Sequence, residues 1–312
     1  MSTLRVLLSL AAQEDYDAHQ LDVKTAFLNE DLESEVYMKC PSGFEVPGKV
    51  WKLEKALYGL RQAAQAWYNK LKASLKGAGF TVSLTDPCLY MTKVQGEYVH
   101  VLVHVDDCLV VGSSTGVRHV KDTIKALFDV KDTGAVSDFL GLEVLRDRAT
   151  GTLWLGQPRY VGRLLEQFSM VDCKSRVTPL DCGTQFSKNG VPLEPTVPYS
   201  ALIDSLLYLN MCTRPDIAHA VALLSHFVSV PSIEHWKAAK SMLRYLAGTK
   251  SLGLCYQDRK QSFIGYTDSD FAGDVKKRTS TGGFVFLYRN QEGSGACVWL
   301  SIGGHKTRPR RA

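Results

Sequence analysis

Apolar and polar positions in the first half of the chain follow two periods, one typical of strands and one typical of helices. Residues 98–105 read Tyr-Val-His-Val-Leu-Val-His-Val, a run rich in β-branched residues that predicts a strand. Residues 108–111 predict a second strand. The Asp106-Asp107 pair stands between the two runs, where a tight hairpin turn belongs.

Two other stretches of this half carry apolar residues at helical spacing. Residues 63–76 place three large apolar residues on one face and end at a glycine, and residues 115–128 show the same spacing. Strands are also predicted over residues 20–26 and 139–145. The resulting order is strand, helix, strand, strand, helix, strand, so we predict an α/β (α+β) fold of the split βαβ type. Many functions share that order, and it does not fix one.

From about residue 156 the pattern becomes helical. We predict helices over residues 158–168 and 233–247, and one that starts near Pro215, while the polar residues 181–198 predict a linker. At the other end of the chain, the short apolar run of residues 6–12 predicts a buried helix. It is too short, and too closely followed by acids, for a signal peptide or a membrane span.

The last part of the chain returns to strand patterns. Residues 263–266 and 283–288 predict strands of a new unit, and residues 306–311 form a basic tail without a core pattern. We therefore expect three parts, over residues 1–150, 151–258 and 259–312.

Composition adds limits to this picture. The 312 residues are 45% hydrophobic and 22% charged, which is typical of a globular protein. The formal net charge of +5 permits nucleic-acid binding without arguing for it. The eight cysteines are scattered and form no CxxC pair, so we expect no zinc site, and in a chain this long without a secretory signal we expect reduced thiols. No run is long enough to cross a bilayer, and we expect no membrane partner.

Three acids in the first half are candidates for chemistry. Asp106 and Asp107 are unfavourable neighbours in a turn, because two like charges side by side repel each other. Asp22 lies on a predicted strand that neighbours the central hairpin in a split βαβ sheet, so Asp22 and Asp106 can converge. Converging carboxylates are how proteins hold Mg²⁺, and two such ions about 3.5–4 Å apart stabilise an in-line phosphoryl displacement. The alternative is that the Asp pair only makes a solvated turn.

Five segments strengthen the first interpretation through a resemblance to a known family. Taken together and in this order, they resemble copia-type retrotransposon reverse transcriptases. The segments are QLDVKTAFLNEDL (20–32), KALYGLRQAAQAWY (55–68), LVHVDDCLVVG (102–112), FLGLEV (139–144) and YTDSDFAGD (266–274).

The resemblance implies a polymerase palm whose carboxylates are Asp22, Asp106 and Asp107. It implies that Asp22, Asp106 and Asp107 hold two Mg²⁺ ions, with Asp22 and Asp106 the better candidates for direct ligation of both and with Mn²⁺ as a substitute. It further implies that Phe27 abuts the incoming sugar. The alternative for Phe27 is a core phenylalanine.

Two more substrate-binding residues are implied. Gln62 would line the nucleotide pocket, and Gly141 would let the primer backbone approach a residue without Cβ. The alternatives are a polar residue that opens a helix and a strand-end glycine. The implied substrates are an RNA or DNA template with a primer and deoxynucleoside triphosphates. The family is intracellular, in cytoplasm or nucleus, and the oligomeric state stays open.

The third part resembles the start of the family's ribonuclease H domain. Asp268 would be its first carboxylate. Further acids of that site would follow on a later helix, which we do not find before residue 312, so we expect a truncated segment without nuclease activity. The middle part would be a thumb or connection region. We also expect the family's basic fingers region, before residue 1, to be largely missing.

Several positions depart from the family pattern. His104, Ala64 and Glu30 replace a tyrosine, a proline and a glycine, and Asp204 stands in an apolar segment where the family has glycine. An acid at this position would lower the stability of the fold unless its side chain is paired or exposed to solvent. Two hypotheses follow: an RNA-directed DNA polymerase fragment, or a catalytically dead retrotransposon relic that is at most a nucleic-acid-binding fold.

Overall fold

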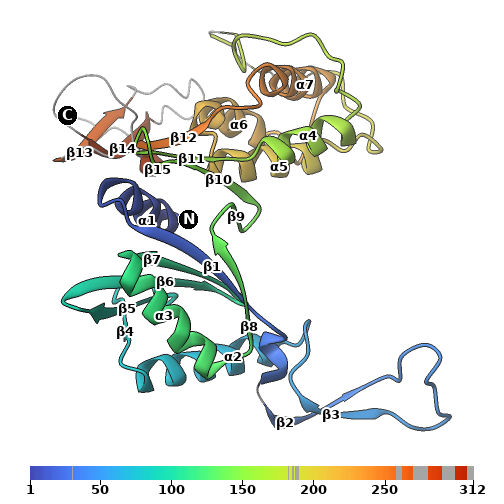
Figure 1. Cartoon of the computed structure of the whole chain (residues 1–312). Coiled ribbons are helices and arrows are strands. Elements are labelled where there is room, and N and C mark those ends of the chain that lie inside the picture. Colours follow the sequence, from blue (N-terminus) through green and yellow to red (C-terminus); the bar gives the residue numbers. More distant parts are fainter. Residues whose placement is uncertain are drawn as a thin grey trace. The chain divides into compact units, whose positions relative to one another are not determined.

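The protein is a mixed α/β molecule with several antiparallel sheets and helices, as a computed structural model shows (Figure 1). The structure describes residues 1–29, 31–181, 183–184, 186, 190–257, 262–269, 280–289 and 299–307. These residues form two compact units. One unit is Glu14–Phe139, and the other combines Met1–Gln13 with the chain from Leu140 onward.

A six-stranded sheet is the centre of the 14–139 unit. Its strand order is β4-β5-β6-β7-β1-β8, and every neighbouring pair is antiparallel. The predicted hairpin is confirmed as β6 and β7, and β1 lies directly beside it, as the split βαβ order required. The strands are β1 (Asp17–Val23), β4 (Thr81–Val82), β5 (Leu89–Val94), β6 (Glu97–His104), β7 (Asp107–Gly112) and β8 (Val130–Ala135).

Two helices cover one face of this sheet. They are α2 (Arg61–Gly77) and α3 (Ser114–Leu127), and both were predicted from helical spacing. Alternate residues of β6, such as Val101 and Val103, share one buried core with Trp67 of α2 and Val120 of α3. This core therefore holds the hairpin between two helices and its neighbouring strands.

The strand predicted over residues 139–145 is divided in two. β9 (Asp138–Phe139) and β10 (Leu142–Asp147) flank Leu140 and Gly141, whose φ angles are +54° and +75°. A left-handed backbone interrupts an extended strand, so the prediction of one continuous strand was wrong. The strand beside β1 is instead β8, whose mostly exposed and polar residues gave no strand pattern.

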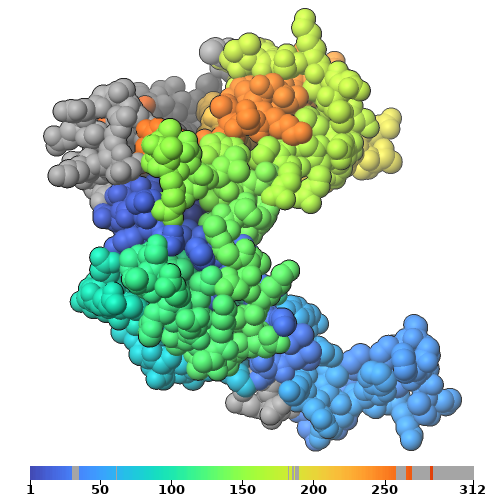
Figure 2. Space-filling model, in the orientation of Figure 1, coloured from blue at the N-terminus to red at the C-terminus, as the bar shows by residue number. Residues whose placement is uncertain are grey.

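A second hairpin leaves this unit as an arm. It consists of β2 (Asp31–Met38) and β3 (Trp51–Lys55), and it follows the short 3-10 helix η1 (Ala26–Asn29). Figure 2 shows the arm in light blue, standing clear of the rest of its unit. Exposed apolar residues gather on it, namely Tyr37, Phe44, Val46, Val50 and Trp51.

The other unit combines a small sheet with helices. β11 pairs with β10 and β12, and α1 packs against β11 and β12, which confirms the predicted N-terminal helix. The remaining helices share one core (Figure 1). The elements are α1 (Ser2–Gln13), β11 (Thr152–Gly156), α4 (Pro158–Gln167), α5 (Tyr199–Cys212), η2 (Pro215–Ile217), α6 (Ala218–Ser225), α7 (Ile233–Gly248) and β12 (Gly253–Gln257).

Helix α5 was missed because its apolar residues are not confined to one stripe. Asp204 lies on it and is exposed, so the acid within this apolar segment remains in contact with solvent. No helix within the described part of the chain is both long and apolar enough to cross a membrane.

A three-stranded antiparallel sheet completes the described chain. Its first two strands, β13 (Ser262–Ser269) and β14 (Ser280–Arg289), were predicted. The third, β15 (Trp299–Thr307), was not predicted. The basic tail beyond residue 307 lies outside the described residues, as does Glu30.

Helix α7 begins with a capping box that contains a buried histidine. The Ser232 backbone N–H donates to His235 Nδ1 at 2.9 Å, and the Ser232 side chain caps the helix in return. His235 is fully buried and stacks on Phe227, with ring centroids 3.9 Å apart. Burial lowers the pKa of His235 below its ordinary value.

This histidine predicts an acid-sensitive helix. Because its pKa is lower in the folded state, its contribution to stability is complete above about pH 6.5 and is lost as the pH falls below it, by at most ~1.4 kcal/mol per pH unit. Glutamine keeps the capping box without a titrating group, so His235→Gln should flatten the dependence of unfolding free energy on pH between 7 and 5. Denaturant titrations at several pH values measure this. The control His219→Gln, at an exposed position, should keep the wild-type slope, and an equal slope in both variants would contradict the prediction.

Candidate active site

The β6–β7 turn is the structural centre of the candidate site. Its two loop residues are Val105 and Asp106, and Val105 has a φ of +58°. A two-residue hairpin loop with positive φ at its first position normally has glycine there, and a β-branched residue is strained by roughly 1–3 kcal/mol.

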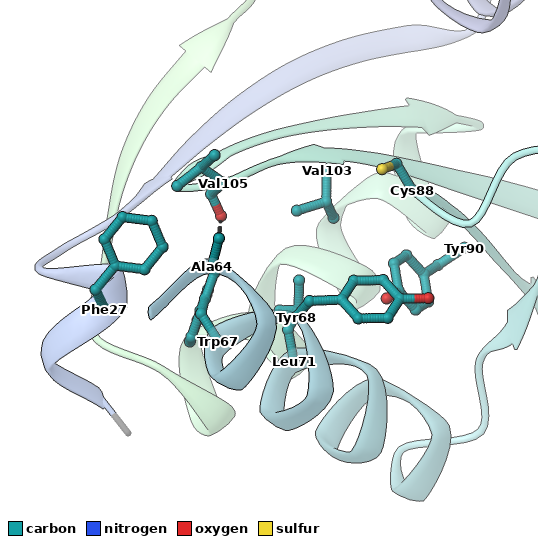
Figure 3. A pocket seen from close by; sticks show the side chains of 9 residues that line it. All are labelled: Phe27, Ala64, Trp67, Tyr68, Leu71, Cys88, Tyr90, Val103 and Val105. Carbon is teal, nitrogen blue, oxygen red and sulfur yellow. Dashed lines mark hydrogen bonds between the residues drawn. The ribbon is translucent and has the colours of Figure 1, made fainter. Parts of the chain in front are cut away.

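Two hydrogen bonds hold this turn in place. The indole Nε1 of Trp67 donates to the carbonyl oxygen of Val105 at 2.7 Å (Figure 3), and the backbone N–H of Val23 donates to the carbonyl oxygen of Asp106 at 2.8 Å. Trp67 itself is 2% exposed and packs edge-on against Phe128. The turn is therefore tied to helix α2 on one side and to the end of β1 on the other.

The three predicted carboxylates lie at this end of the sheet. Asp22 is opposite Asp107 in the antiparallel register of β1 and β7. The bond from Val23 to Asp106 brings the third acid beside them, and all three side chains are half-buried. The structure thus brings Asp22, Asp106 and Asp107 together, as their placement on neighbouring strands predicted.

The carboxylates affect one another electrostatically. Burial raises the pKa of Asp107, and the charges of Asp106 and Asp22 raise it further, against the hydrogen bond from Gln20 and the attraction of His104. Behind them, burial together with the three negative charges raises the pKa of the Cys108 thiol to about 12. Such mutual repulsion is a property of sites that bind cations.

Two residues that sequence reasoning missed contact these acids. Gln20 donates from Nε2 to Asp107 Oδ1 at 2.9 Å, and the Tyr58 hydroxyl donates to Asp106 Oδ2 at 3.1 Å. Burial, that hydrogen bond and the nearby carboxylates raise the pKa of Tyr58. Gln20 had a detectable signal, because it lies two residues before Asp22 on a strand and so shares its face.

The carboxylate oxygens of these three acids are the type of ligand that a hard divalent cation prefers. Among the described side chains, no lysine or arginine forms an ion pair with Asp22, Asp106 or Asp107, so their charge is left for another cation. In the same part of the chain, no three acids, histidines or cysteines are grouped closely enough to hold a metal ion by themselves. Mg²⁺ is commonly held by one or two carboxylates, with waters and substrate phosphates as the other ligands.

The predicted substrate-binding residues Phe27 and Gln62 differ in their surroundings. Phe27 lies in η1, 8% exposed, and packs edge-on against Tyr58 with centroids 4.4 Å apart; it belongs to the core as well. Gln62 is exposed in the first turn of α2. The structure therefore keeps Phe27 near the carboxylates, and it shows no contact that would assign a role to Gln62.

Gly141 and Asp268 belong to the other unit. A Cβ at Gly141 would lie 3.6 Å from the Tyr208 hydroxyl, an ordinary contact, so its φ of +75° is the reason for glycine there. Asp268 is exposed on β13, opposite Gly283 of β14.

Comparison with known proteins agrees with this geometry. Residues 1–182 match the family model described as reverse transcriptase (RNA-dependent DNA polymerase). The chain belongs to the reverse transcriptase family, among the copia-type retrotransposon proteins.

Its relatives include a Pol polyprotein from a tobacco transposon, TNT 1-94 of Nicotiana tabacum. The two are 42% identical over 313 residues, which cover 96% of this chain and 23% of the relative. A Pol polyprotein from transposon RE1 of Arabidopsis thaliana is 39% identical over 91% of this chain and 20% of its own length. A Saccharomyces cerevisiae protein attributed to transposon Ty5-1 is 32% identical over 86% of this chain and 88% of its own length. This reverse transcriptase chain thus spans about a quarter or less of the plant Pol polyproteins.

The raised pKa of Asp107 predicts a gain in stability when its charge is removed. A folded-state pKa above the ordinary value of 3.8 means that stability is complete below that value and is lost as the pH rises through the folded-state pKa. Asp107→Asn keeps an acceptor for Gln20, so at pH 7 we expect an unfolding free energy about 0.5–1 kcal/mol higher.

Denaturant titration at pH 7 and near pH 4 measures this gain, which should shrink at the lower pH. The matched control is Asp129→Asn, since Asp129 is an exposed acid of the same unit that pairs with Lys24 at 3.0 Å. That variant should change stability little or slightly lower it. A loss of stability in Asp107→Asn at pH 7 would disprove the proposed repulsion.

Proposed function

We propose that this chain acts as an RNA-directed DNA polymerase, which adds deoxynucleotides to a primer 3′ end on an RNA or DNA template. The reverse transcriptase family generally uses divalent metal ions, and we assign them here to Mg²⁺, two ions, with Mn²⁺ as a substitute. The observation that carries the proposal is the strained β6–β7 turn, which holds Asp106 beside the end of β1 where Asp22 lies.

The three acids would have different roles. Asp107 begins β7 and accepts a hydrogen bond from Gln20, and Asp106 in the turn accepts one from the Tyr58 hydroxyl, so one oxygen of each is already engaged. Asp22 and Asp106 would hold the ions, which stabilise the attacking and leaving oxygens of the phosphoryl transfer when bound. Asp107 would complete the negative field and, with Gln20, keep the end of β7 in register.

The substrate contacts are proposals of the same kind. Phe27, supported from one side by Tyr58, would exclude a 2′-hydroxyl from the sugar position. Gln62 would line the nucleotide pocket, and Gly141 would face the primer backbone. In the third part, Asp268 would remain from a ribonuclease H site without nuclease activity here.

The second hypothesis is a catalytically dead relic that is at most a nucleic-acid-binding fold, and the departures from the family pattern at His104, Ala64 and Glu30 favour it. The two hypotheses differ in whether substrate and ions complete the site, and primer extension separates them.

Primer extension on an RNA template, with deoxynucleotides and either Mg²⁺ or Mn²⁺, tests the function. We expect extension by the chain and at least ~100-fold less by Asp106→Asn or Asp22→Asn, because metal stabilisation of the transition state is worth several kcal/mol. Asp129→Asn, an exposed acid outside the site, should extend as the wild type does. Absence of extension by chain that is folded by circular dichroism would favour the relic.

The role of Phe27 has its own test. Phe27→Val should raise ribonucleotide relative to deoxynucleotide incorporation by about 10-fold or more, because the side chain that meets a 2′-hydroxyl becomes smaller. The ratio of single-nucleotide incorporation rates measures this. Phe80→Val is the matched control, since Phe80 is 4% exposed in the same core. Unchanged discrimination in the first variant would reduce Phe27 to a core residue.

A further inference from the structure

Tyr58 lies just before helix α2, and the structure restrains it although its side chain is 58% exposed. It is the second residue of a four-residue turn, which is closed where the backbone N–H of Leu60 donates to the carbonyl oxygen of Leu57 at 3.3 Å. Gly59 is the third residue, with a φ of +97° and open space where a Cβ would stand, so the turn conformation is the reason for glycine there. The backbone of this turn therefore fixes the point from which Tyr58 leaves the chain.

The ring of Tyr58 rests against a side chain that belongs to the core. Phe27 meets it edge-on, with ring centroids 4.4 Å apart and an interplanar angle of 60°. Phe27 is 8% exposed and shares the core that holds β6 between α2 and α3. Exposed side chains change rotamer readily, but a closely packed core does not yield to them. Contact with Phe27 therefore limits the movement of Tyr58.

The hydroxyl of Tyr58 reaches the carboxylate of Asp106. It donates to Oδ2 at 3.1 Å, and within the described residues this is the only side-chain hydrogen bond that Asp106 accepts. The bond from Val23 fixes the backbone of Asp106, but a carboxylate turns easily about its last torsion angle. Tyr58 therefore supplies a restraint on the carboxylate that the backbone of the β6–β7 turn does not.

This hydrogen bond leaves Asp106 able to bind a cation. A carboxylate has about four acceptor positions on its two oxygens, and the Tyr58 hydroxyl takes one of them. A carboxylate that ligates a metal ion is commonly hydrogen-bonded itself, and its partner sets its orientation. The hydroxyl of Tyr58 suits that part, because it donates to the carboxylate and carries no positive charge that would repel the ion.

We propose that Tyr58 is a positioning residue, which extends the rigidity of the core from Phe27 to the carboxylate of Asp106 and so presents that carboxylate to a divalent cation. The inference rests on the proposed function, since it takes Asp106 to be a metal ligand. It goes further because it assigns part of the cation affinity to an exposed side chain that is not itself a ligand. Removal of the hydroxyl then weakens cation binding while all three acids are intact.

Binding of Mn²⁺ to the whole chain tests this without any substrate, with the electron paramagnetic resonance signal of the free ion as the readout. The affinity that is lost in Asp106→Asn defines the site. We expect Tyr58→Phe, which keeps the ring against Phe27, to bind Mn²⁺ there roughly 3- to 10-fold more weakly, the difference that one hydrogen bond makes. Tyr37→Phe is the matched control and should bind as the wild type does, since the Tyr37 hydroxyl donates to an exposed acid of the arm, Glu35, at 2.9 Å.

A double-mutant cycle tests the link to Phe27. Phe27→Val removes the ring on which Tyr58 rests, and we expect it to weaken Mn²⁺ binding by about 2-fold or more when Tyr58 is present. In the Tyr58→Phe background the same change should have no further effect, because no hydroxyl is left to be misplaced. Additive effects of the two changes would contradict the proposed route through Tyr58.

The outcome of these measurements is separable from that of primer extension. Equal Mn²⁺ binding by the wild type and Tyr58→Phe, or tighter binding by the variant, would overturn the inference even if the chain extends primers. Weaker binding by a folded Tyr58→Phe variant, together with an absence of extension by the wild type, would support the inference and favour the relic.

Discussion

The hydrogen bond from the Trp67 indole to the carbonyl oxygen of Val105 is the interaction on which the candidate site depends. Val105 adopts a backbone conformation that costs a β-branched residue roughly 1–3 kcal/mol, and such strain persists only where the surroundings enforce it. The indole can hold this conformation because Trp67 is itself fixed. It is buried between α2 and the sheet and packs against Phe128. The position of Asp106 is thus set by the packing of a helix rather than by the turn alone.

The same unit also tolerates an unfavourable electrostatic interaction. Three carboxylates lie at one end of the sheet, and burial and mutual repulsion raise the pKa of Asp107. The antiparallel register between β1 and β7 places Asp22 opposite Asp107, so the acids are held by backbone hydrogen bonds and cannot relax apart without losing them. A site of this kind is less stable than an uncharged one, and it gains stability when a cation binds.

Sequence patterns predicted much of this unit, for physical reasons that can be named. Strong β-branched alternation marked β6, helical spacing marked α2 and α3, and strand adjacency placed Asp22 beside the hairpin. The patterns failed where burial is weak or the backbone is unusual: β8 is largely exposed, and Leu140 departs from a strand through a positive φ that no apolar period encodes. The division of the chain into parts at residues 150 and 258 stays a prediction.

Individual side chains show the same limit more sharply. Trp67 is one of the three large apolar residues that the helical spacing of residues 63–76 placed on one face, and it is buried, while Trp51 and Tyr58 are exposed. No sequence pattern predicted the hydrogen bond from Tyr58 to Asp106, because this contact depends on the path of the loop before α2.

An incomplete set of candidate metal ligands is compatible with the reverse transcriptase assignment on chemical grounds. Mg²⁺ gives up its waters reluctantly, so proteins that use it with phosphates rarely build a complete protein cage for it. Asp106 and Asp107 each accept one side-chain hydrogen bond, from Tyr58 and Gln20. No lysine or arginine is paired with any of the three acids in the described residues, which leaves room for substrate oxygens. Such a site would acquire its full ligand set only with the triphosphate bound, and the strained turn would keep Asp106 in place until then.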